Sequence, residues 1–160
     1  MRELPKTDFN LEEYLPIISE VIESGGEFRL FPRGTSMRPL IRQGVDSVVL
    51  VKCEGKIRRG DIILYRRESG QLVLHRVVKV EKNGTYTLCG DNQTQLEKGI
   101  ERKDVLAVVS ALYRGEKRIS NRNLRFTTYK KIWCVMPIRK AYFRLRSARS
   151  KIKKIFKTKQ

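Results

Sequence analysis

The sequence predicts a mainly β protein, a small barrel or sandwich with a helix at each end. Three observations support this. Short apolar runs follow one another between about residues 28 and 113, and turns containing Gly or Asn separate them. The tripeptide Lys82-Asn83-Gly84 between two such runs is a strong hairpin signal. A helical pattern precedes these runs, and a strongly basic one follows them.

The expected strands are short and close together, as in small barrels and sandwiches. Within the chain they are predicted at residues 27–32, 47–53, 61–66, 71–81, 85–89 and 105–113. Residues 92–104 are polar and are expected to form a loop.

An N-terminal helix is predicted at about residues 10–24. Its apolar positions have helical spacing: Leu11, Tyr14 or Leu15, Ile18, Val21 and Ile22. Asn10 and Glu13 can form a capping box, with Asp8 as an alternative cap. Pro16 marks either the first turn or a kink, and Gly25-Gly26 ends the helix. Packing on the core is the expected role, because four acidic residues disfavour a helix on a membrane surface.

Charge divides the chain into two parts. The 160 residues carry a net charge of +18. Residues 1–110 hold 18 Lys and Arg against 16 acids, and residues 111–160 hold 17 against one. We therefore expect one domain at 1–113, with a β core from about residue 28, and a basic tail at 114–160. A tail of this charge fits a polyanionic partner.

The tail predicts a basic amphipathic helix. From Ile138 onward, Tyr142, Leu145, Ile152 and Phe156 recur at roughly three- and four-residue spacing among Lys and Arg. Aromatic residues beside cations favour an anionic membrane surface as the partner of residues 132–160. Nucleic acid is the less favoured partner, and a solvated or disordered tail is the third reading.

Several sites and signals are not expected. No secretory signal begins the chain, and no run approaches the roughly 20 apolar residues of a membrane span. The expected location is therefore cytoplasmic or peripheral at a membrane. Three cysteines without metal-ligand spacing predict neither a disulfide framework nor a zinc site. No metal and no cofactor are expected.

Three polar residues suggest nucleophilic chemistry. Ser36 lies in a turn between two expected strands, His75 lies within an apolar run, and Asp91 follows the next strand. A serine hydroxyl becomes a nucleophile when a base takes its proton, and a carboxylate can orient that base. In the alternative reading, His75 is a core histidine and Asp91 caps a turn.

The residues around Ser36 are candidates for the oxyanion or substrate site. The backbone N–H of Ser36 is the natural oxyanion donor, and Thr35 can add a second. Gly34 permits a sharp turn and close approach of a peptide. Met37 is included in this candidate set.

Four motifs resemble those of the signal peptidase superfamily, which includes the LexA-like repressors. Their order and approximate spacing agree over residues 28–112. The motifs are Gly34-Thr35-Ser36-Met37-Arg38-Pro39, Gly60-Asp61-Ile62-Ile63, His75-Arg76-Val77-Val78 and Gly90-Asp91-Asn92. The resemblance implies the β-ribbon core of that superfamily.

A histidine at position 75 resembles the endoplasmic-reticulum, archaeal and SipW-like branch, whereas the other branch uses lysine. The resemblance implies a serine endopeptidase for signal or leader peptides, with Ser36 and His75 catalytic and Asp91 assisting. Glu97 is the nearest match to a further acid of that family. Members of that branch carry a transmembrane anchor, which this sequence does not show. A LexA-like regulator and a non-catalytic membrane- or peptide-binding module are the alternative functions.

Overall fold

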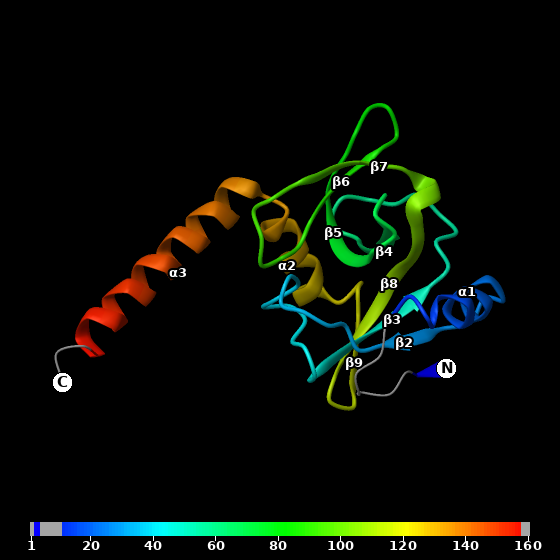
Figure 1. The fold of residues 1–160 in the computed structure, drawn as a ribbon, viewed down its shortest axis with the longest axis horizontal. Coiled ribbons are helices and arrows are strands. Elements are labelled where there is room, and N and C mark those ends of the chain that lie inside the picture. Colours follow the sequence, from blue (N-terminus) through cyan, green and yellow to red (C-terminus); the bar gives the residue numbers. More distant parts are fainter. Residues whose placement is uncertain (1, 4–10, 158–160) are drawn as a thin grey trace.

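The computed structural model describes residues 2–3 and 11–157 (Figure 1). Strands dominate the first three quarters of the chain and helices the last quarter. In chain order the elements are β1 (Arg2–Glu3), α1 (Leu15–Glu23), β2 (Phe28–Leu30), β3 (Asp46–Val51), β4 (Ile62–Arg66), β5 (Leu72–Val80), β6 (Tyr86–Cys89), β7 (Glu97–Ile100), the 3-10 turn η1 (Arg102–Asp104), β8 (Val105–Arg114), β9 (Lys117–Ser120), α2 (Leu124–Trp133) and α3 (Met136–Lys157).

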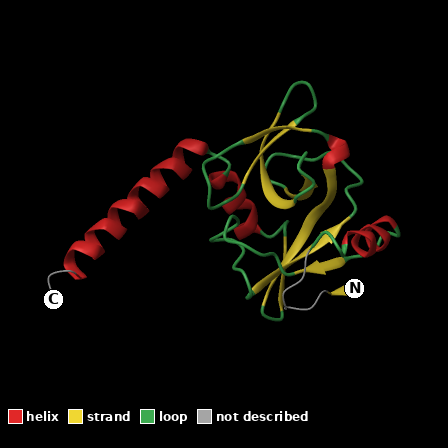
Figure 2. Cartoon of the chain, in the orientation of Figure 1, coloured by secondary structure: helices red, strands yellow, loops and turns green. Residues whose placement is uncertain are grey.

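One curled sheet forms the body of the molecule (Figure 2). The strand order is β1-β2-β3-β8-β4-β5-β6-β7, with β9 paired to β8. Among the described strands every pairing is antiparallel except that of β1 with β2. The prediction of a mainly β fold with a helix toward each end is confirmed.

Strand β4 separates two apolar cores. Ile62 and Leu64 contribute to a core shared with α1, β2, β3 and β8, whereas Ile63 and Tyr65 contribute to a core shared with β5 and β6. Successive side chains of a strand point to opposite faces, so a strand between two cores is apolar throughout. This explains the uninterrupted apolar run at the start of β4.

The N-terminal helix is shorter than predicted. It begins at Leu15, and Pro16 lies in its first turn, where a missing N–H costs no helical hydrogen bond. Ile18 and Ile22 are its buried residues, which confirms the packing role. The Asn10 end of the predicted capping box lies outside the described residues.

The expected polar loop at 92–104 contains a strand and a helical turn. Strand β7 pairs with β6 through Tyr86–Ile100 and Leu88–Glu97, and η1 follows it. Strand β7 reads Glu-Lys-Gly-Ile, so only one of its four residues is apolar, and its sequence lacks an apolar–polar alternation. Strand β7 therefore forms because it pairs with β6, and not because its residues have a high intrinsic β-propensity.

The last quarter of the chain first packs on the body of the molecule and then projects away from it. Strand β9 extends the sheet, and α2 buries Phe126 in the core that includes Ile62 and Leu64, and Trp133 beside the Asp91 carbonyl. Helix α3 then projects away from the strands (Figure 1). None of the helices among residues 11–157 has the length and apolar character needed to cross a bilayer.

Candidate active site

Ser36 lies in a tight turn that follows β2. Gly34 adopts a φ of +81°, and its N–H donates to the Gln43 side chain at 3.1 Å. A turn hydrogen bond of 3.2 Å from Arg38 to the Thr35 carbonyl encloses Ser36. A positive φ is a conformation that glycine adopts at little cost. The turn therefore presents a half-buried Ser36 at the edge of the body.

His75 lies in the middle of β5 and is only 2% exposed. It pairs directly with Ile63 of β4, so its side chain lies on the same face as Ile63 and Tyr65. Because this face also carries the core that Ile63 and Tyr65 share with β5 and β6, the imidazole is buried beside that core.

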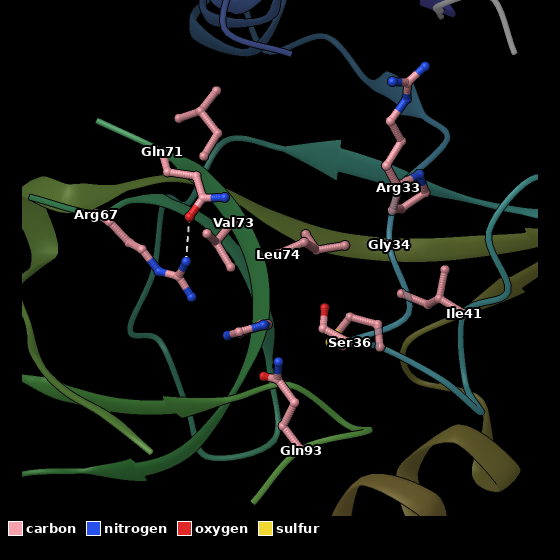
Figure 3. Close-up of a pocket in the computed structure, with 13 residues that line it drawn as sticks. Arg33, Gly34, Ser36, Ile41, Arg67, Gln71, Val73, Leu74 and Gln93 are labelled. Atoms are coloured by element: carbon pink, nitrogen blue, oxygen red, sulfur yellow. Dashed lines mark hydrogen bonds between the residues drawn. The ribbon is translucent and has the colours of Figure 1, made fainter. Parts of the chain in front are cut away.

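The turn of Ser36 and the ring of His75 line one pocket of about 240 Å3. Gly90 shows how closely they approach. A Cβ atom on Gly90 would lie 2.8 Å from the Ser36 carbonyl oxygen and 3.0 Å from His75 Nε2. Figure 3 shows the polar ends of Ser36 and Gln93 directed into this pocket.

The other ring nitrogen of His75 faces a carboxylate. Glu97 of β7 places Oε1 at 3.0 Å from His75 Nδ1. Arg67 Nη2 donates to that oxygen at 2.6 Å, and Arg67 Nε donates to Oε2 at 2.8 Å. Tyr65 donates its hydroxyl to Oε2 at 2.6 Å. Glu97 is thereby held in one orientation against the imidazole.

These contacts have consequences for ionisation. Burial lowers the pKa of His75, and the charge of Glu97 offsets part of that change. Partial burial would by itself raise the pKa of Glu97, but hydrogen bonds from Arg67 and Tyr65 and nearby positive charge lower it to about 2. Near neutral pH the site therefore holds a neutral imidazole beside an ionised carboxylate.

Asp91 occupies a different network. It is fully buried, and its carboxylate accepts two hydrogen bonds of 2.7 Å from Arg76 and one of 3.2 Å from Tyr129. Arg76 follows His75 directly on β5, so the two side chains point to opposite faces of the strand. Arg76 thus binds the Asp91 carboxylate on the face of β5 opposite the imidazole. The acid that contacts His75 Nδ1 is Glu97.

The C-terminal helices complete this network from outside the sheet. Arg139 of α3 is fully buried and lies 3.7 Å from the Asp91 carboxylate. It donates to the carbonyls of Gly90 at 2.8 Å and Gln93 at 3.3 Å. Trp133 donates its indole N–H to the Asp91 carbonyl at 2.7 Å. The turn at 90–93, which contacts the Ser36 carbonyl through the Asn92 N–H at 2.6 Å, is therefore anchored by the tail.

The remaining predicted residues are distributed differently around the pocket. Gly34 and Met37 line it, and the Met37 side chain is also buried in the core that α1, β2, β3 and β8 share. Thr35 is exposed and is absent from the described pocket lining. Gly34 and Met37 thus belong to the wall, while Thr35 lies on the outer side of the turn.

One family model matches more than half of the chain. The model of the Peptidase S24-like family matches residues 3–111. The chain belongs to that family. Comparisons with curated proteins and with solved structures gave no match. The S24-like region covers α1 through most of β8 and contains Ser36, His75 and Glu97, whereas Arg139 lies beyond it.

Sequence reasoning missed two parts of this S24-like site. Tyr65 of β4 and Arg67, which follows the end of that strand, hold Glu97, and only their i, i+2 spacing was available in the sequence as a signal. Arg139 is one of 17 cations after residue 110, and nothing in its local sequence separates it from the exposed ones.

Gly90 offers a test of the close approach within the site. Gly90→Ala should destabilise the fold by about 1–3 kcal/mol, because its Cβ would meet the Ser36 backbone oxygen and the His75 ring. Thermal unfolding measures this change. Gly55→Ala is the matched control, since a Cβ there meets no atom within 4 Å. Equal melting of both variants would contradict the described packing.

Proposed function

We propose that this S24-like protein is a serine endopeptidase with Ser36 as nucleophile, His75 as general base and Glu97 as the acid that orients the base. Two observations carry the proposal: Glu97 contacts His75 Nδ1, and His75 lines the same pocket as Ser36. Each role has the residue type that such chemistry requires.

In this mechanism the neutral His75 accepts the Ser36 hydroxyl proton as Oγ attacks the scissile carbonyl. With Nδ1–H held by Glu97, Nε2 is the nitrogen available as base. The imidazolium that forms is stabilised by the Glu97 carboxylate, and it returns the proton to the leaving amine. We assign the Ser36 backbone N–H as the oxyanion donor. Water then releases the acyl group by the same steps.

The surroundings of Ser36 favour a peptide as substrate. A second hollow of about 490 Å3 adjoins the first and shares Gly34, Leu72 and Leu74 with it. Leu30 and Leu64 add to its apolar lining. An extended peptide crossing the Ser36 turn would place one apolar side chain in this hollow. Processing of a signal or leader peptide, as the sequence motifs imply, is the form of the reaction that we propose.

Acylation of Ser36 tests the proposal directly. A fluorophosphonate should label Ser36 of the full chain, as located by mass spectrometry, and Ser36→Ala should abolish labelling. Because burial lowers the pKa of His75, the labelling rate should stay high below pH 6.5 and fall only as His75 becomes protonated at lower pH. Folded protein that neither reacts at Ser36 nor cleaves any member of a diverse peptide mixture would overturn the proposal.

A further inference from the structure

Helix α3 carries an apolar stripe on its exposed side. At about 100° per residue, Ile138, Ala141, Leu145 and Ala148 fall on one side of the helix. Ile138 is 46% exposed and Leu145 is 67% exposed. The sequence continues the same spacing to Ile152. An exposed row of this kind indicates a surface that a partner covers.

The opposite side of α3 is already occupied. Arg139 is buried against the turn at 90–93, and Arg146 donates to the Asn92 side chain at 2.8 Å. These contacts fix which side of the helix faces the body. The apolar stripe therefore faces away from the body, and the projecting helix in Figure 1 leaves it accessible.

Positive charge borders the stripe. Helix α3 contains nine Lys and Arg and no acid along its 22 residues. Arg144 and Arg149 lie on the two flanks of the stripe, and both are exposed. An apolar strip between two cationic edges complements a bilayer with anionic headgroups, where apolar burial and charge attraction act together.

We propose that α3 binds flat on an anionic lipid bilayer, with Ile138 and Leu145 inserted and Arg144 and Arg149 on lipid headgroups. A nucleic acid would use the cations but not the apolar stripe, because phosphate contacts dominate such binding. An anionic bilayer can bind both the cations and the apolar stripe. The proposal concerns binding alone and does not require the pocket to be catalytic.

Sedimentation of the full chain with vesicles tests this surface. We expect binding to phosphatidylcholine vesicles that contain phosphatidylglycerol and little binding to phosphatidylcholine alone. Leu145→Gln should weaken binding roughly tenfold. The matched control is Leu124→Gln, since Leu124 is 79% exposed but lies on α2, and this change should leave binding unaltered.

A second pair of variants tests the cationic edges. Arg144→Gln with Arg149→Gln should weaken binding about thirtyfold, whereas Arg122→Gln with Arg125→Gln, both exposed and outside α3, should have a much smaller effect. Circular dichroism shows whether each variant keeps its helices. Equal binding to both vesicle types, or to neither, would overturn the proposal. So would tight binding of double-stranded DNA together with lipid binding that Leu145→Gln does not change.

Discussion

Replacing Glu97 with Gln should lower kcat for peptide cleavage by about 10^3- to 10^4-fold while the fold persists. The amide cannot stabilise the imidazolium that forms at His75, and it can favour the wrong tautomer by donating to Nδ1. The exposed Glu54→Gln is the matched control and should cleave like the unmodified protein. Steady-state kinetics on the best-cleaved peptide of a mixed library measures the difference.

The pH profile separates a catalytic role for Glu97 from a purely structural one. The Glu97 carboxylate raises the pKa of His75 against the lowering effect of burial. Its removal should shift the acidic limb of the kcat/KM profile to lower pH. If Glu97→Gln retained full activity and folded Asp91→Asn lost it, Asp91 rather than Glu97 would be the orienting acid.

Asp91→Asn should instead act on stability, lowering the free energy of unfolding by about 3–5 kcal/mol. Arg76 and Arg139 are fully buried against this carboxylate, and both guanidinium groups would lose it together. For a chain of this size the melting temperature should fall by roughly 6–20 °C. Calorimetry measures the shift, with the exposed Glu116→Gln as a control that should melt like the unmodified protein.

A double-mutant cycle shows whether α3 belongs to the same network. Arg139→Met should also destabilise the protein, because it removes the hydrogen bonds to the carbonyls of Gly90 and Trp133. The losses of unfolding free energy in Asp91→Asn and in Arg139→Met should sum to more than the loss in the variant that carries both changes. The reason is that each single variant leaves a partner unpaired. Strict additivity would mean that Asp91 and Arg139 act independently.

The sequence by itself predicted many of the local features. Apolar runs between glycine turns predicted the strands, and helical spacing beyond Ile138 predicted the long basic helix, because both patterns are periodic along the chain. The motifs around Ser36 and His75 predicted the family. Strand β7 was missed because its residues are polar and its pairing supplies the stability.

Only the tertiary structure decided which acid meets His75. Ser36, His75 and Asp91 come in an order that suits a catalytic triad, but β5 sends His75 and Arg76 to opposite faces, and Arg76 holds Asp91. Glu97 reaches the imidazole because β7 lies beside β6, two strands from β5 in the sheet. The place of Arg139 beneath the same turn also depends on how α3 docks. Sequence patterns report the face that a residue occupies on its own element, whereas contacts between faces are set by how the elements pack.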